Sequence, residues 1–338
     1  MSQLQPLPVF INEIAGADRG LICGYQLFAT GKPREISADS IGESLARHDV
    51  VTWLHFNLSD ARARRWLLDA HFLPAPMREV LQEHDENRRI EIAESGLLLV
   101  IGDFAFDRAD PSEVATLWCF ADANVVITAR LHPVRSADEM RLQVRSGIEV
   151  SNGIELLCAL LDLRTARLKS LANEMTDQLD QLEDEILAGS IKQQREQLGR
   201  MRRLCARLRR QFAPERADFN KFLHRAANAN LSLDRASLQA STDVMGFAIE
   251  EIAELYERAK LLQEELASRL AENTSRNLYV LSILTAVLLP MTLVTGIFGM
   301  NVAGMPGLHN AAAFWKVMLL IFASGAFTLA ALFWRRLL

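Results

Sequence analysis

Residues 278–298 read LYVLSILTAVLLPMTLVTGIF, and residues 314–334 read FWKVMLLIFASGAFTLAALFW. A helix needs about 20 apolar residues to cross the hydrocarbon core of a membrane, which is about 30 Å thick. Both stretches have this length, and Lys316 is the only charged side chain in either of them. The sequence therefore predicts two transmembrane helices near the C-terminus, joined by a short loop.

The part of the chain before these stretches predicts a large soluble region. The protein has 338 residues and a net charge of −5, which argues against nucleic acid as a partner. The start, MSQLQPLPVF, has no basic segment followed by an apolar one, so we expect no signal peptide.

The cysteines are far apart and form no CxxC pair, so we expect reduced, buried thiols instead of a zinc site. They are Cys23, Cys119, Cys158 and Cys205.

The charges that flank the two spans predict their orientation. Arg269 and Arg276 precede the first span, Arg335 and Arg336 follow the second, and residues 299–313 contain no Lys or Arg. Segments rich in Lys and Arg stay in the cytoplasm. We therefore expect a multi-pass membrane protein with both termini in the cytoplasm and the connecting loop outside.

Residues 1–147 alternate strand-like and helix-like segments. The strand-like segments are rich in Val, Ile, Leu and aromatic residues, whereas the helix-like ones have apolar residues at helical spacing. The expected strands are 20–30, 51–57, 96–106, 115–121 and 124–129, and the expected helices are 62–70 and 75–83. This pattern predicts a cytoplasmic α/β domain with a mixed sheet.

Residues 148–276 show almost no strand signal and predict a helical stalk. We expect one helix as far as residue 188, and a second that ends at Phe212, because Pro214 disfavours helix in the residue before it. A third helix begins after Ser232 and continues to Phe298. Apolar residues recur in it every seven positions, as in helices that pack together. They are Leu238, Met245, Ile252, Ala259 and Leu266.

These segments predict an α+β membrane protein built in five parts. An N-terminal cytoplasmic α/β domain is followed by a long helical stalk and two C-terminal transmembrane helices. The predicted boundaries are 1–147 for the α/β domain, 148–276 for the stalk, 277–298 for the first transmembrane helix, 299–313 for the outer loop and 314–334 for the second transmembrane helix.

Two spans are too few to enclose a pore within one subunit. Lipid cannot satisfy polar groups, so polar side chains in the first span must face protein or water. Ser282, Thr285, Thr292 and Gly299 fall near a common helix face, so several copies around an axis could line a conduit. Alternatively, the hydroxyls bond back to their own helix. Spacing alone leaves both interpretations open.

The run LPMTLVTGIFGMN at residues 289–301 resembles the signature of the CorA-type metal ion transporters, a proline-containing pore helix that ends in Gly-Met-Asn. The resemblance extends to RRQFAPER at 209–216 and to RIE at 89–91. It implies a homopentamer in the cell inner membrane, with a funnel-shaped cytoplasmic part over a five-fold pore lined by the first span. No Walker loop, GxSxG or HExxH motif is present, so we expect no enzyme.

Within that family, the loop resembles the ZntB zinc-transport branch. Gly307 stands where the magnesium branch commonly has an acidic residue, and NVAGMPG at 301–307 and RNLYVLS at 276–282 look like the zinc branch. The resemblance implies Zn²⁺ as the transported substrate, with proton-coupled uptake favoured and no cofactor. The expected partners are therefore Zn²⁺, possible other divalent cations, H⁺, the lipid bilayer and four further copies of the chain. The alternatives are a Mg²⁺, Co²⁺ or Ni²⁺ channel of the same family and, more remotely, a membrane-anchored sensor or scaffold.

The motif suggests how an ion would be handled. A ring of Asn301 side chains would offer neutral oxygens to the water shell of an ion without removing it, and Gly299 lets the backbone approach closely. Met300 is expected to pack behind the mouth, with a thioether ligand as the weaker interpretation, and Pro290 can kink the helix. Deeper hydroxyls and an apolar constriction that gates by dewetting complete the predicted pathway. These residues are Thr292, Thr285 and Ser282, followed by Leu281 and Leu288 or Leu289.

Other ionisable residues carry two interpretations each. His309 in the outer loop could recruit Zn²⁺ or sense pH, or be a plain loop histidine. His84, Asp85 and Glu86 could contribute to a zinc site, although a surface turn is the simpler interpretation. The stalk acids could concentrate cations or form a solvated face paired with basic residues. The acids are Asp177, Asp180, Glu183, Asp184, Glu185, Glu250, Glu251, Glu254 and Glu257, and the basic residues are Arg200, Arg202, Arg203, Arg207, Arg209 and Arg210.

Overall fold

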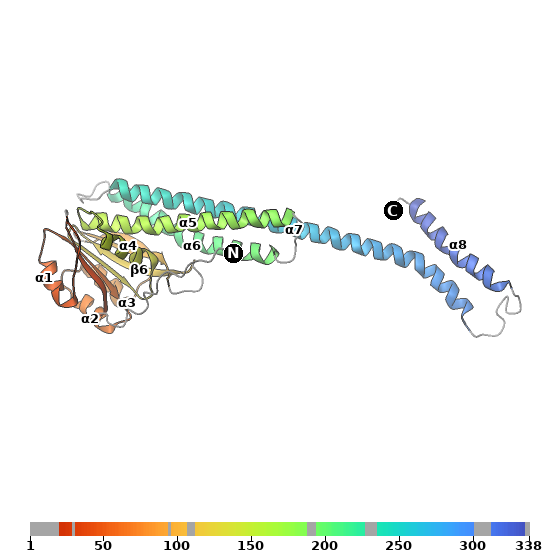
Figure 1. The fold of residues 1–338 in the computed structure, drawn as a ribbon, viewed down its shortest axis with the longest axis horizontal. Coiled ribbons are helices and arrows are strands. Elements are labelled where there is room, and N and C mark those ends of the chain that lie inside the picture. Colours follow the sequence, from red (N-terminus) through yellow and green to blue (C-terminus); the bar gives the residue numbers. More distant parts are fainter. Residues whose placement is uncertain are drawn as a thin grey trace. The chain divides into compact units, whose positions relative to one another are not determined.

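The computed structural model describes residues 20–28, 31–93, 96–106, 112–187, 194–226, 235–300 and 312–334. The chain separates into two compact units, Met1–Leu262 and Gln263–Leu338. The first contains one mixed sheet and the helices on it. The second contains two apolar helical segments (Figure 1).

The sheet of the first unit has seven strands in the order β2-β1-β3-β7-β6-β5-β4. Strands β3 and β7 run parallel, and every other neighbouring pair is antiparallel. The strands are β1 (Leu21–Leu27), β2 (Arg34–Glu35), β3 (Val51–Asn57), β4 (Arg89–Ala93), β5 (Gly96–Phe104), β6 (Val114–Ala121) and β7 (Val125–Arg130). The predicted mixed sheet is therefore confirmed, and β3 has the predicted bounds.

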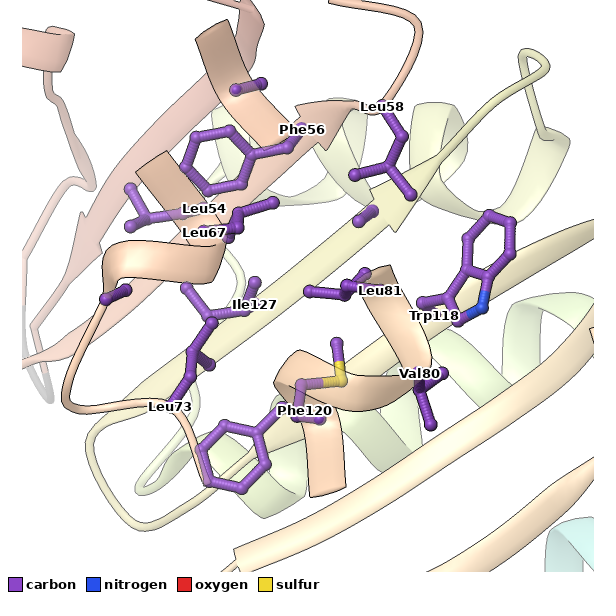
Figure 2. Packing of buried hydrophobic residues seen from close by; sticks show 14 of the residues in the cluster. Leu54, Phe56, Leu58, Leu67, Leu73, Val80, Leu81, Trp118, Phe120 and Ile127 are labelled. Atoms are coloured by element: carbon purple, nitrogen blue, oxygen red, sulfur yellow. The ribbon is translucent and has the colours of Figure 1, made fainter. Parts of the chain in front are cut away.

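One face of the sheet packs against α2 (Ala61–Asp69) and α3 (Ala75–Glu83). Successive residues of a strand point to opposite faces, so Leu54 and Phe56 of β3 share this face with Trp118 and Phe120 of β6 (Figure 2). Burying a large apolar side chain contributes about 1.5–3 kcal/mol. The cluster therefore accounts for the apolar and aromatic residues by which the sequence predicted these strands.

The opposite face packs against helices on its other side, and strand β5 is buried along its whole length. This explains why β5 reads as the nearly continuous apolar run GLLLVIGDF. The helices on this face are α4 (Arg135–Ser146), α5 (Gly153–Leu187) and α6 (Gln194–Ala226). The first part of α7 (Arg235–Phe298) packs against α5 and α6, alongside which it runs in Figure 1.

Buried polar groups on this second face satisfy one another. Arg130 Nε donates to His55 Nε2 over 3.0 Å, so the ring proton is on Nδ1, which donates to Thr128 Oγ1 over 2.7 Å. Burial and the nearby Arg130 charge lower the pKa of His55 well below its ordinary value. Asp103 accepts from the amide and hydroxyl of Ser136, yet burial raises its pKa to about 6.

The long helices confirm the predicted heptad packing. Every residue of the predicted set in α7 is buried, and Ile252 has no exposed surface. The helix is described over 64 residues, Arg235–Phe298, and ends at the predicted Phe298; the predicted start after Ser232 lies outside the described residues. The short elements β2 and β4, the helix α4, the 3-10 turn Ala38–Ser40 and the helix α1 (Ile41–Leu45) were not predicted as such.

The predicted end of the second stalk helix at Phe212 is wrong, because α6 continues through Pro214 to Ala226. Proline removes one backbone donor and disfavours helix at the preceding residue. Tertiary contacts of residues on both sides of Pro214 keep the helix continuous. Phe212 stacks on Phe104 of β5 with ring centroids 5.5 Å apart, and Glu215 is buried in an ion pair with Arg164 of α5.

This ion pair joins three elements at one backbone position. Glu215 accepts from the Gly102 amide over 3.2 Å, Arg164 Nε donates to the Gly102 carbonyl, and the two side chains contact each other. Both are only 2% exposed. The Arg164 guanidinium also lies over the Phe212 ring, 5.1 Å from its centroid. Strand β5, helix α5 and helix α6 are therefore tied together at Gly102.

We predict that Glu215→Leu destabilises the protein by about 3–5 kcal/mol, because it leaves the Arg164 guanidinium buried without its carboxylate. Thermal unfolding of the full-length protein in detergent measures the loss. The double variant Arg164→Met/Glu215→Leu should recover most of the melting temperature, since it removes both charges. Asp49→Asn, which breaks the exposed Arg47–Asp49 pair, is the control and should melt like the wild type. A wild-type melting temperature for Glu215→Leu would show that the pair does not tie the helices to the sheet.

Candidate ion pathway

The second unit consists of the end of α7 and helix α8 (Ala313–Trp334), both long and apolar enough to cross a membrane. Many large apolar side chains of both helices are exposed in the single chain, including Leu281, Leu293, Leu319 and Phe327. A water-facing helix would not carry such a surface. The two helices therefore require lipid or further protein around them, as the sequence predicted.

Helix α7 turns one narrow stripe of side chains toward α8. The stripe consists of the half-buried residues between positions 281 and 295, which recur at intervals of three and one and so lie on one helix face. They are Ile283, Ala286, Val287, Pro290, Met291 and Val294. Gly325 is the buried residue of α8, and a Cβ there would collide with the Met291 methyl group. Met291 on Gly325 is thus a close contact between the two helices.

The predicted lining residues lie on the other side of α7. Successive residues of an α-helix are about 100° apart, which places Thr285, Thr292 and Gly299 roughly opposite the stripe that faces α8, with Ser282 on the flank of that face, about 110° from the middle of the stripe. The predicted constriction residues Leu281, Leu288 and Leu289 are on this same side and are exposed in the single chain. The chain itself therefore leaves this face open, so that another copy or an ion pathway can meet it.

Each hydroxyl on that face donates to its own helix. Ser282, Thr285 and Thr292 donate to the carbonyls of Leu278, Leu281 and Leu288, in each case over 2.8 Å. The back-bonded arrangement considered from the sequence is therefore present. It does not exclude a role in lining, because a hydroxyl has one proton and two lone pairs. With the proton used inside the helix, the oxygen still offers acceptor sites on its outer side.

Helix α7 continues through Pro290 and ends at the motif. Pro290 cannot donate to the Ala286 carbonyl, and both residues belong to the stripe that faces α8. The Gly299 amide donates to the Thr295 carbonyl over 2.8 Å, and a Cβ at position 299 would stand 3.0 Å from that same oxygen. Glycine therefore permits the tight turn that ends the helix.

The remaining motif residues are only partly described. The Met300 side chain is exposed in the single chain, and its amide donates to the Ile297 carbonyl over 3.4 Å. Asn301 and His309 lie outside the described residues. Their assignment to the ion pathway therefore stays a prediction.

Three of the stalk acids form ion pairs with other basic residues than those expected. Arg258 of α7 bonds Asp180 over 2.7 Å and Glu183 over 3.0 Å, and these carboxylates raise its pKa. Arg216 bonds Glu250 over 3.1 Å. For these three acids the expected pairing with the basic run between residues 200 and 210 is wrong, because the rotation of each helix brings other arginines to them.

The sequence left two interpretations open for His84, Asp85 and Glu86: part of a zinc site, or a surface turn. His84 has a left-handed backbone with φ 50° at the end of α3, and Asp85 forms an ion pair with Arg89 and accepts from the Asn87 amide. This is the surface turn, and no group of three His, Cys, Asp or Glu residues suited to a metal occurs among the described residues. The four cysteines are free and buried, as expected, and burial raises the pKa of Cys23 to about 12.

The sequence analysis did not assign the stripe that packs α7 on α8. Its signal was available, because Gly325 sits in the small-residue run ASGA in the middle of the second span. Small residues let transmembrane helices approach closely. Reading that run would have identified the face of α8 that contacts α7.

Comparison with known proteins adds independent evidence. Residues 48–336 match the protein family described as CorA-like Mg2+ transporter protein. The chain is 30% identical over 310 residues to the divalent cation transporter CmaX of Pseudomonas aeruginosa, covering 91% of this chain and 93% of CmaX. It is 25% identical over 307 residues to the zinc transport protein ZntB of Yersinia enterocolitica, covering 90% of this chain and 92% of ZntB.

Solved structures agree with these sequence matches. The structure of full-length CmaX has a TM-score of 0.79 at 30% identity and covers 96% of this chain and 99% of that one. The CorA magnesium transporter of Methanocaldococcus jannaschii has a TM-score of 0.73 at 17% identity, with coverage of 92% and 97%, and shows the shared fold. The family expected from the Gly-Met-Asn run is confirmed, and the chain belongs to the CorA-like family of divalent cation transporters.

Proposed function

We propose that this protein carries Zn²⁺ through a homopentameric pore in the cell inner membrane, in the inward direction and coupled to protons, with both termini in the cytoplasm. The observation that carries the proposal is the division of α7 into two faces. One face packs on α8, and the opposite face holds the hydroxyls and the glycine of the motif. A single hairpin cannot enclose a path, so the open face is the one that five copies would turn toward a shared axis.

Along such an axis the pathway would be neutral. The hydroxyl oxygens of three positions on α7 keep acceptor sites, and the loop at residues 299–313 contains no carboxylate. Neutral oxygens hold a divalent ion weakly, so the ion can leave as well as enter. A ring of Asn301 amides would contact its hydration water. The name of the ZntB relatives and the missing loop carboxylate support Zn²⁺ as the ion.

A second candidate is a Mg²⁺, Co²⁺ or Ni²⁺ channel. It is favoured by the identity of 30% to CmaX, which is named for divalent cations in general and exceeds the 25% identity to ZntB. The complete Gly-Met-Asn sequence is compatible with both candidates. Measuring which ion the purified protein transports distinguishes the two candidates.

In proteoliposomes we expect faster Zn²⁺ uptake than Mg²⁺ uptake at equal concentration and equal pH. An inward proton gradient should increase the Zn²⁺ rate. Ion-sensitive dyes inside the vesicles measure both fluxes, and empty vesicles give the leak. Faster Mg²⁺ than Zn²⁺ uptake would favour the second candidate, and no flux of any divalent ion would contradict both.

We expect Asn301→Ala to reduce Zn²⁺ uptake at least about tenfold, because it removes the amide oxygens of the ring while an assembled oligomer is retained. Native mass measurement checks the assembly, and dye-based uptake measures the flux. Asn310→Ala, a second asparagine of the same loop, is the matched control and should transport normally. Wild-type flux in assembled Asn301→Ala would remove this residue from the pathway.

His309→Ala should change the pH profile of Zn²⁺ uptake between about pH 6 and 7, near the unperturbed histidine pKa of about 6.5. Neither span contains a carboxylate, so this imidazole is the side chain best suited to respond to outside pH. Uptake at stepped outside pH measures the effect, with the exposed His71→Ala as control. Superimposable profiles for wild type and His309→Ala would exclude the residue from coupling.

A further inference from the structure

A groove of about 500 Å³ lies between α5 and α6 in the first unit. From α6 it is lined by Arg200, Arg203 and Arg207, which are spaced three and four positions apart and so share one helix face. Its floor is apolar, with Leu182 and Met201 buried beneath the arginines. Grooves of this volume are within the range of small-molecule sites.

The polar groups around the groove are mainly donors. Gln178 and Gln181 face it from α5 and Gln197 from α6, and each amide can donate. Glu185 is the carboxylate of the lining, and its two oxygens accept from Gln181 over 3.4 Å and from Gln194 over 3.0 Å. The lining therefore combines three guanidinium groups with one carboxylate that is already occupied by amides.

The charge of this groove is part of a wider imbalance on α6. Between Gln194 and Gln211 the helix carries seven arginines and a single acid, Glu196, which lies 3.6 Å from Arg200. The contacts described above show that Asp180 and Glu183 of α5 are instead bound to Arg258 of α7. These two acids of α5 thus face α7 and not the groove.

We infer that this groove binds an extended phosphorylated anion, such as an oligophosphate or a nucleoside oligophosphate. Guanidinium groups bind phosphate through paired hydrogen bonds. At about 1.5 Å per residue, Arg200 and Arg207 are about 10 Å apart along the helix, so one ligand must carry negative charge over this span to contact all three arginines. A single orthophosphate cannot do so. The apolar floor gives room for an uncharged part of the ligand, and the site is independent of which ion is transported.

The test is calorimetric titration of the metal-free full-length protein in detergent with inorganic tripolyphosphate. We expect one saturable site for each chain, and at least about tenfold weaker binding of orthophosphate, which can contact only part of the arginine row. The variant Arg200→Gln/Arg203→Gln should weaken tripolyphosphate binding by about tenfold or more. Both side chains are exposed, so the fold should persist, as circular dichroism and native mass can verify.

The variant Arg209→Gln/Arg210→Gln is the matched control. It removes the same charge from the same helix at two exposed residues outside the groove, and it should bind tripolyphosphate like the wild type. Equal losses in the two double variants would show diffuse attraction to a basic helix and overturn the proposal. Absence of saturable binding to the wild type would also overturn it.

A final comparison identifies the source of the phosphate groups. The titration is repeated in lipid nanodiscs of phosphatidylcholine alone and of phosphatidylcholine with phosphatidylglycerol. Unchanged affinity in the anionic discs supports a free oligophosphate as ligand. The opposite result is weaker tripolyphosphate binding by the wild type in the anionic discs than in the neutral ones, with no such difference for Arg200→Gln/Arg203→Gln. It would assign the groove to lipid headgroups and overturn the proposal of a free oligophosphate ligand.

Discussion

Polar groups that leave water must find partners inside the protein, and this requirement operates in both units of the chain. In the first unit it is met by Arg164 and Glu215 around the backbone of Gly102, and by the chain of donors from Arg130 through His55 to Thr128. In the second unit each described hydroxyl on the open face of α7 donates to its own helix. The same constraint therefore fixes the helices on the sheet and makes a hydroxyl-bearing helix compatible with a bilayer.

The consequence for α7 is a helix with two separate surfaces. Ala286 and Pro290, the two residues whose backbone hydrogen bond proline removes, contribute to the half-buried side toward α8. The opposite side keeps its oxygen acceptors exposed along several turns. If this face lines the proposed pathway, it places little fixed charge near a moving ion, which suits passage more than storage.

The sequence was most informative where the pattern is long and one physical rule dominates. Absence of charge predicted apolar helical segments that end at Phe298 and run from 314 to 334, and α7 ends at Phe298 while α8 is Ala313–Trp334. Richness in Val, Leu and aromatic residues predicted β3 with its bounds. The heptads of α7 identified Ile252 as buried. The errors arose where distant contacts outweigh a local preference. Pro214 predicted a helix end, but Phe212 and Glu215 are held by β5 and α5, which no local window reveals.

The candidate pathway shows the same limit. The spacing of Ser282, Thr285 and Thr292 gave their shared face, but it did not reveal that this face is opposite α8, because the rotation of one helix against another is set by side chains such as Met291 and Gly325. The ion partners of Asp180 and Glu183 were missed for the same reason. Short elements such as β2 have too few residues for any periodicity to appear.

Packing α8 entirely on one side of α7 has a further consequence for how such a chain can vary. Since the hydroxyls of the open face all belong to α7, substitutions in α8 can adjust the protein to bilayers of different thickness or composition without touching that face. On the proposed pathway, changes in ion preference would be confined to one arc of α7 and the loop that follows it. The hairpin thereby separates adaptation to the host membrane from adaptation to the transported metal, and the two can proceed independently.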